Sequence, residues 1–337
     1  NLDVLYRNDV INIPFIFRSN ISGDKTINEI SFVGNRAYLS TNLGIVVVNL
    51  DRYEISSTYI IGNGGVQVRV YGFAAANGKF YAATEEGLKV ANQNSANLAD
   101  FNNWTLLSNA NGLPQGPVRQ VLSINNTIYV RYFSSLYVLN GTQWQLLYND
   151  DFQWRSMDAS GNNIHIAEEQ NDWTRRRVVV LSTNGTVQQI VENNSLLRFP
   201  QHAATRNNEL LIADEGAGLI RLSGGSPTII RNNSPYGALD GEMLVKDNKL
   251  YVAGGSVTDS WFFGFNRTGF FTFNDDTWTD FNRFTLPWMD SVLDVISIAV
   301  DPRNNTIYAG SYGSGLIEFE SPTRYKIYKQ GSPIGFT

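Results

Sequence analysis

One pattern, two short apolar strands joined by a polar turn, recurs seven times along the 337 residues and limits the possible folds more than any other feature. The clearest copy is NGKFYAATEEGLKVAN at residues 77–92. The residue after the first apolar position anchors each copy, at Tyr38, Tyr81, Tyr129, His165, Leu211, Tyr251 and Tyr308. Successive anchors lie 43, 48, 36, 46, 40 and 57 residues apart, with a mean of 45. A period of about 40–50 residues built of short strands is typical of a β-propeller, in which each repeat forms one blade.

A single blade has two apolar faces, so it must stack on neighbouring blades. The repeat therefore predicts an all-β chain, a seven-bladed β-propeller of four-stranded antiparallel blades over residues 27–337. We expect the blades near residues 27–62, 66–108, 117–148, 152–192, 198–231, 236–282 and 292–330. Residues 1–26 carry two further strands, LDVLY and VINIPFI, which either end a preceding blade or complete another blade of the ring. Because the chain begins at Asn1 without a signal-like segment, we expect a processed protein or part of a longer one.

The charge of the chain argues against nucleic acid as a partner. The formal net charge is −5, the isoelectric point is near 5.2, and the basic residues are scattered except at 175–177. No apolar run approaches the roughly 18 residues that a membrane-spanning helix needs, so the sequence predicts no transmembrane segment.

Cysteine and histidine, which many catalytic and metal sites use, are scarce in this sequence. The chain has no cysteine and only two histidines, His165 and His202, neither at metal-ligand spacing from acidic residues. His165 occupies the tyrosine position of its repeat, so we interpret it as a packed core residue. The sequence contains no Gly-x-Ser-x-Gly elbow, Walker loop or dinucleotide fingerprint. We therefore predict no catalytic residues, no metal, no cofactor and no enzyme activity.

Three blades place a pair of acidic residues at the same turn, and we treat these six as a candidate acidic face: Glu85, Glu86, Glu168, Glu169, Asp214 and Glu215. Equivalent turns of a propeller lie on one face of the disc. Carboxylates gathered there would suit a cation, or an acid/base pair for glycan cleavage. We favour the alternative that they are solvated polar turns beside glycine.

The turn of the fourth blade is extended and carries four candidate ligand residues, Trp173, Arg175, Arg176 and Arg177. An aromatic ring beside arginine forks suits anionic sugar or phosphate groups. Salt bridges between these arginines and the neighbouring acidic pair are the alternative that we favour.

The turn of the sixth blade is the longest, SVTDSWFFGFNR at residues 256–267, and the segment LPWMD follows at 286–290. Its aromatic residues exceed what two strands need for packing: Trp261, Phe262, Phe263, Phe265 and Trp288. Excess aromatic rings on a loop mark a partner surface or a sugar-stacking platform. A local apolar core beneath the loop explains them equally well.

Three stretches carry a resemblance to a known family: NEISFVGNRAYLSTNLGIVVVNLDRYEISSTYIIG at 28–62, GKFYAATEEGLKVA at 78–91 with LADFNNW at 98–104, and VISIAVDPRNNTIYAGSYGSGLIEFE at 295–320. They closely resemble the PorZ N-terminal propeller family of the Bacteroidetes type IX secretion system. The GLP turn at 112–114 and the T-x-x-GL step at 84–88 are similar to the wider two-component-regulator propeller family.

The resemblance implies a secreted, non-catalytic binding and scaffolding propeller at the outer face of the outer membrane. The implied partners are proteins of a cell-surface complex that includes a sortase, and anionic lipopolysaccharide. No family motif assigns individual ligand residues to this sequence. The alternative hypothesis is the oligosaccharide-sensing propeller of a hybrid two-component receptor.

Overall fold

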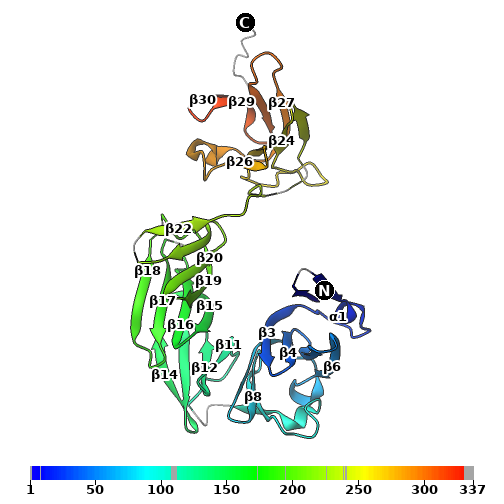
Figure 1. Ribbon diagram of the computed structural model, residues 1–337, viewed down its shortest axis with the longest axis vertical. Coiled ribbons are helices and arrows are strands. Elements are labelled where there is room, and N and C mark those ends of the chain that lie inside the picture. The colour runs from blue at the N-terminus through cyan, green and yellow to red at the C-terminus, as the bar shows by residue number, and fades with distance from the viewer. Residues whose placement is uncertain are drawn as a thin grey trace. The chain divides into compact units, whose positions relative to one another are not determined.

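The computed structural model describes residues 2–7, 9–107, 112–172, 174–193, 195–224, 226–237, 239 and 241–329. The chain divides into two compact units, Asn1–Arg231 and Asn232–Thr337. Within the described residues it forms seven four-stranded antiparallel sheets and one two-stranded sheet (Figure 1). The strands of each four-stranded sheet follow one another in chain order, which is the arrangement of propeller blades. The predicted seven-bladed, all-β propeller fold is therefore confirmed.

The first unit holds the first five blades, each built of four consecutive strands. Blade 1 contains β3 (Ile27–Val33), β4 (Arg36–Thr41), β5 (Gly44–Asn49) and β6 (Glu54–Tyr59). Blade 2 contains β7 (Val70–Ala76), β8 (Lys79–Thr84), β9 (Gly87–Asn92) and β10 (Thr105–Leu107). Blade 3 contains β11 (Gln120–Ile124), β12 (Thr127–Tyr132), β13 (Ser135–Asn140) and β14 (Gln143–Asn149). Blade 4 contains β15 (Gln153–Ser160), β16 (Asn163–Glu169), β17 (Arg176–Ser182) and β18 (Val187–Glu192). Blade 5 contains β19 (Pro200–Arg206), β20 (Glu209–Asp214), β21 (Gly218–Leu222) and β22 (Pro227–Ile230).

The second unit holds the remaining two blades. Blade 6 contains β23 (Met243–Lys246), β24 (Lys249–Ala253), β25 (Phe270–Asn274) and β26 (Thr277–Phe281). Blade 7 contains β27 (Val295–Val300), β28 (Ile307–Ser311), β29 (Gly315–Ser321) and β30 (Arg324–Tyr328). A short 3-10 helix at Pro287–Ser291 connects these two blades.

The N-terminal residues form a hairpin of β1 (Leu2–Tyr6) and β2 (Asp9–Ile13), followed by the single-turn helix α1 (Phe15–Arg18). Pro14 was expected to limit the second strand, and β2 does end at Ile13, but the rest of the VINIPFI segment is helical rather than extended. Pro14 caps α1 instead, because its fixed φ of −82° suits a helix start and its missing N–H cannot extend the strand pairing. Ile13 and Ile16 pack with Leu39 and Val46 on one face of blade 1.

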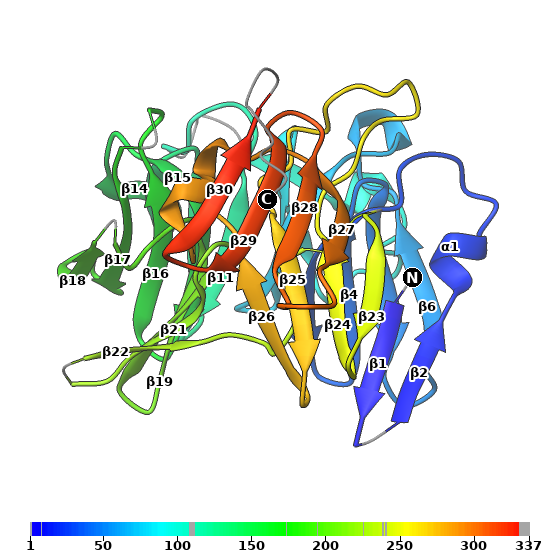
Figure 2. The ribbon, with the colours of Figure 1, turned by 90° about the horizontal axis from the view of Figure 1, so that it is seen from above.

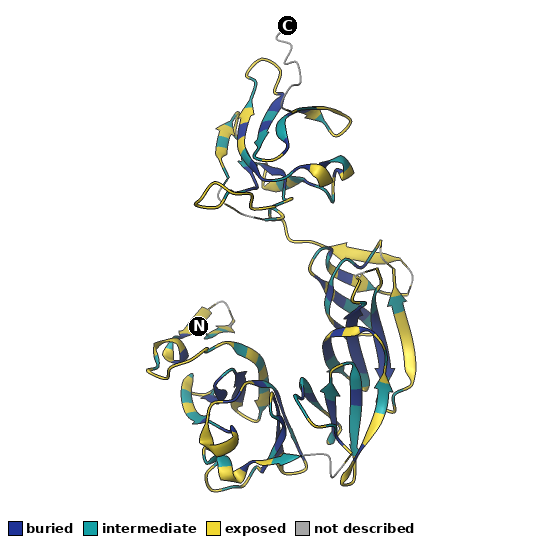
Figure 3. Cartoon of the chain, turned by 180° about the vertical axis from the view of Figure 1, so that it is seen from behind, coloured by how far each residue is buried: buried dark blue, intermediate teal, exposed yellow. Residues whose placement is uncertain are grey.

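Adjacent blades stack through apolar residues of their middle strands. Between blades 1 and 2, the rings of Tyr38 and Phe73 are stacked with centroids 4.5 Å apart. Between blades 4 and 5, buried His165 places Nε2 2.7 Å from Thr205 Oγ1, which confirms the prediction of a core histidine. Burial falls toward the outer strands, and Figure 3 shows β18 and β22 largely exposed.

A β-bulge near the start of the first strand recurs in most blades. The register shifts between Val70 and Gly72 in blade 2 and between Trp154 and Ser156 in blade 4. In blade 2 the Phe73 N–H donates to the Glu29 side chain of blade 1 at 3.2 Å, and in blade 4 the Met157 N–H donates to the Gln120 side chain of blade 3 at 3.0 Å. In each blade that has one, the bulge turns one side chain of the first strand away from the hydrogen-bonded pairing with the second strand.

The described helices are all short. None of them is long and apolar enough to cross a membrane.

Candidate functional site

The acidic residues of the repeated turn each have a local partner. In blade 2, Glu86 forms a 2.7 Å ion pair with buried Lys89, and Glu85 accepts a hydrogen bond from the Arg69 backbone N–H. In blade 5, buried Asp214 accepts hydrogen bonds from four backbone N–H groups, those of Arg198, Phe199, Gly216 and Ala217. Exposed Glu215 accepts a 3.3 Å hydrogen bond from Gln201. These carboxylates stabilise the turns in which they lie, through hydrogen bonds and an ion pair.

In blade 4 the acidic pair is buried within a cluster of charged and aromatic side chains. Glu168 and Arg177 are partners in the β16–β17 register, and Arg177 Nε donates to Glu168 Oε1. Arg177 also pairs with Asp150 at 3.0 Å and lies over the Phe152 ring, 3.7 Å from its centroid. Glu169 faces the other side of the sheet and pairs with Arg155. The expectation of solvated acidic residues was therefore wrong for Glu168 and Glu169, and also for Asp214, because all three are at most 5% exposed.

The electrostatics of the blade-4 cluster follow from this burial. Burial, and then the nearby Asp150 carboxylate, raise the pKa of Glu168 to about 8 against the opposing effect of Arg177. Glu168 therefore keeps its proton at neutral pH, and the Arg177 cation is balanced by the Asp150 anion. Asp150 also accepts hydrogen bonds from the Tyr148 hydroxyl and the Trp154 indole, both at 2.9 Å. The cluster therefore carries no net charge, and its polar groups pair with one another.

The predicted arginine group of the blade-4 turn is divided among different partners. Arg175 is exposed and forms a bidentate pair with Glu192 at the blade edge, whereas Arg177 points inward. Arg176 lies over the Phe199 ring, 4.8 Å from its centroid. Trp173 lies outside the described residues.

The long turn of blade 6 has an ordered backbone, and Figure 2 shows it as the yellow loop extending beyond the strands β24 and β25 that it joins. Asp294, which is fully buried, accepts hydrogen bonds from the backbone N–H groups of Phe265 at 2.9 Å and Asn266 at 2.8 Å. The Asn266 side chain donates to the same carboxylate at 3.0 Å. An isolated antiparallel bridge joins Val257 to Phe263. One buried carboxylate thus fixes the returning half of the loop.

The aromatic rings of this loop are mostly exposed. Trp261, Phe262 and Phe265 are 67%, 69% and 70% exposed, and we call these three residues the aromatic platform. Phe263 is less exposed, at 39%; its ring meets Tyr312 edge to face at 5.2 Å and stacks on Phe265 at 5.6 Å, and Trp261 lies 6.5 Å from Tyr312. Trp261 and Phe265 have φ values of 57°, a left-handed conformation that costs a bulky residue roughly 1–2 kcal/mol. None of these four rings is buried, so a local apolar core does not account for them.

Trp288 is separate from the platform. Its ring stacks on Tyr325 at 3.8 Å and lies near Phe319, and it packs against the core between blades 6 and 7. This predicted partner residue is half-buried packing in the second unit.

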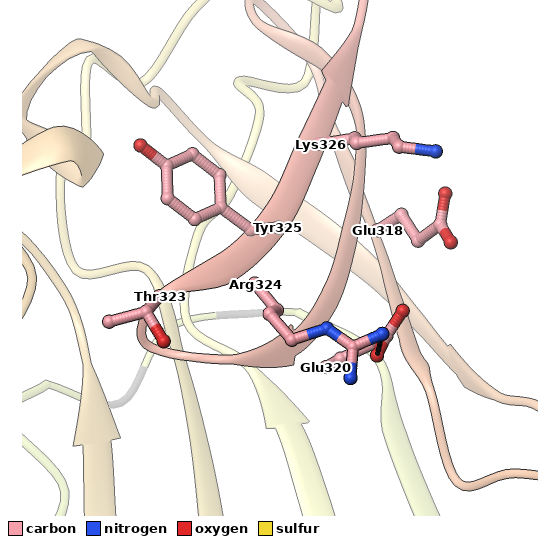
Figure 4. A pocket seen from close by; sticks show the side chains of 6 residues that line it. All are labelled: Glu318, Glu320, Thr323, Arg324, Tyr325 and Lys326. Atoms are coloured by element: carbon pink, nitrogen blue, oxygen red, sulfur yellow. Dashed lines mark ion pairs between the residues drawn. The ribbon is translucent and has the colours of Figure 1, made fainter.

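Figure 4 shows a hollow of about 270 Å³ beside the β29–β30 hairpin, lined by Glu318, Glu320, Thr323, Arg324, Tyr325 and Lys326. Its charges alternate, because Glu318 lies opposite Lys326 in the strand register and Glu320 pairs with Arg324 at 2.8 Å. The hollow therefore offers no net charge to a ligand. No group of three or more potential ligands that could hold a metal ion lies among the described residues.

Comparisons with known proteins agree with this fold. Residues 1–105 match the family described as the N-terminal β-propeller domain of PorZ of the type IX secretion system. The structure of PorZ from Porphyromonas gingivalis, described as an essential bacterial surface component of that system, aligns with 98% of this chain at 21% identity and a TM-score of 0.78. This chain spans 44% of that structure. The chain thus resembles the PorZ propeller in part of its sequence and in its fold.

A second similar structure is the extracellular domain of a protein from B. thetaiotaomicron described as a hybrid two component system. It aligns with 96% of this chain, at 13% identity and a TM-score of 0.48, and this chain covers 42% of it. Comparison with curated proteins finds no match.

Proposed function

We propose that this chain is a non-catalytic binding and scaffolding propeller of the type IX secretion machinery, and that the aromatic platform is its partner contact. The match of residues 1–105 to the PorZ N-terminal propeller carries the proposal. The finer parts follow from the same resemblance: a position at the outer face of the outer membrane, and contacts with a sortase complex and with anionic lipopolysaccharide.

The geometry of the polar residues supports binding rather than catalysis. A general acid or base must reach a substrate, whereas Glu168 and Glu169 are at most 2% exposed and both are held by arginines. The acidic residues of blades 2 and 5 are engaged in their own turns.

The aromatic platform has the features of a partner contact. Large aromatic rings that are solvent-exposed yet held on an ordered backbone bind with little loss of conformational entropy. The loop holds its shape through Asp294, so the three rings are free to contact another molecule.

The test replaces the chromosomal gene with a variant in which Trp261, Phe262 and Phe265 are alanine. We expect at least a tenfold loss of type IX cargo secretion while the variant protein accumulates normally. A Phe17→Ala variant is the matched control, since Phe17 is 70% exposed on the N-terminal segment. Normal cargo secretion in the triple variant would remove the platform from the proposal, and normal secretion in a gene deletion would reject the proposed function.

A further inference from the structure

One blade departs from the repeat at a position where the others carry small residues. Six blades place a small residue on the second strand opposite the bulge region of the first strand: Ser40, Ala83, Ala167, Ala213, Ala253 and Gly310. Blade 3 has Arg131 there, opposite Gln120. An arginine at a position that elsewhere accommodates a methyl group is costly to bury, so its presence requires an explanation.

Arg131 is held in place by backbone carbonyl groups. Its Nε donates to Phe133 O at 3.0 Å, Nη2 donates to Trp154 O, and Nη1 lies 3.5 Å from Arg155 O. These contacts orient the guanidinium but supply no negative charge. The guanidinium also lies 5.9 Å from the centroid of the Trp154 ring, and its other N–H groups donate no hydrogen bond to any described residue.

A second arginine lies beside the first. The Arg119 backbone N–H donates to Arg131 O at 2.9 Å, and the Arg119 guanidinium lies over the Tyr71 ring at 4.8 Å and near the Phe133 ring at 6.0 Å. Its side chain makes no hydrogen bond or ion pair with any residue that the structure describes. Both residues are partly buried.

The two cations lack a compensating acid. Burial, together with the Arg119 charge, lowers the pKa of Arg131 to about 10, and no carboxylate opposes this effect. The neighbouring blade shows the contrast, because Arg155 and Arg177 each pair with a buried glutamate. Two adjacent guanidinium groups without a counter-charge are repulsive unless an anion joins them.

We propose that Arg119 and Arg131 form a binding site for an oxyanion, the phosphate or carboxylate group of a small molecule or saccharide. Guanidinium forks bind both groups through paired charge-assisted hydrogen bonds. Arg131 presents the fixed fork, and Arg119, stacked on Tyr71, supplies the second cation. This site lies in the first unit and is independent of the aromatic platform in the second.

Isothermal titration calorimetry on the whole chain, at constant ionic strength set with chloride, tests the site with inorganic phosphate and with glucuronate. Wild type is expected to bind at least one of them, and the tighter probe identifies the recognised group. Arg131→Ala introduces the small residue that other blades carry, so this variant is expected to fold. It and Arg119→Gln should each bind at least tenfold more weakly.

Arg52→Gln is the control, because Arg52 is an arginine with a 74% exposed side chain, paired with Glu54 on blade 1. It should bind like wild type. The proposal is overturned if wild type binds neither probe, or if Arg131→Ala and Arg119→Gln, both folded by circular dichroism, bind as tightly as wild type.

Discussion

The long turns of blades 4 and 6 occupy the same place in the repeat, between the second and third strands, and they differ in what they expose. The blade-4 turn joins β16 to β17 and its charged side chains fold back onto Glu168, Asp150 and Glu192. The blade-6 turn joins β24 to β25 and presents Trp261, Phe262 and Phe265 to solvent. Charged side chains of the blade-4 turn pair with carboxylates of the protein. The blade-6 turn is held through hydrogen bonds to its backbone and leaves its aromatic side chains exposed.

The difference shows how a turn becomes available for binding. Buried carboxylates must be neutralised, so the arginines of blade 4 are committed to their own blade. In blade 6 the loop is held through its backbone, by the Asp294 carboxylate and by the Tyr312 hydroxyl, which donates to Trp261 O. Three predictions test this contrast, from the largest effect to the smallest.

Removal of the inward arginine of blade 4 should have the largest effect. Arg177→Ala leaves Asp150 without its cation in a buried site, and such a loss costs about 3–5 kcal/mol of folding free energy. Arg175→Ala removes an exposed, solvent-screened pair and should cost far less folding free energy than Arg177→Ala. Urea denaturation of the two variants measures both. Equal losses of folding free energy in the two variants would show that Arg177 and Arg175 contribute equally to stability.

Removal of the blade-6 carboxylate should have an intermediate effect. Asp294→Ala leaves the partly buried N–H groups of Phe265 and Asn266 without their acceptor, at a cost of about 2 kcal/mol. Hydrogen exchange at these two amides should accelerate far more than exchange in β27. Asp294→Asn keeps one acceptor oxygen and tolerates the observed φ of 46°. Its exchange rates at these two amides should lie between those of Asp294→Ala and wild type. Unchanged exchange in Asp294→Ala would mean that the rings hold the loop.

Over the range from pH 6.5 to 8, the pH dependence of stability should show the smallest effect, at most about 2 kcal/mol. The pKa of Glu168 rises from an ordinary 4.5 to about 8 on folding, so between these values the folded state binds one more proton than the unfolded state. This proton stabilises the fold at low pH, and its contribution falls with rising pH by at most about 1.4 kcal/mol per unit until pH 8.

The lowered pKa of buried His165 acts in the opposite direction below its ordinary value of 6.5, so the informative range is pH 6.5 to 8. Over that range Glu168→Gln, which cannot ionise, should lose less stability than wild type in parallel urea titrations. Identical slopes for the two proteins would mean that Glu168 is already ionised at neutral pH.

Much of the fold was predictable because the signals are local. Alternating apolar residues set each strand, glycine and asparagine set each turn, and the repeat sets the number of blades. The end of the second strand at Pro14 also follows from a local signal, but the sequence pattern did not reveal that α1 starts there. The buried state of His165 followed from its position in the repeat.

The partners of the candidate residues were not predictable. Asp150 precedes Arg177 by 27 positions, and Asp294 follows Phe265 by 29, so neither contact leaves a sequence signal. Arg131 did carry a signal, because it interrupts a column of small residues, but the column emerges only when the strand register is known.

The sequence by itself determined the blades of this protein, because hydrophobic periodicity and turn chemistry act within a few residues of one another. Only the tertiary structure decided which polar and aromatic side chains are available to a partner. That choice depends on packing within and between blades, which brings a carboxylate to Arg177 and to Arg155 and, among the residues that the structure describes, none to Arg131 or Arg119. It also depends on Asp294, which holds the loop whose three rings remain exposed.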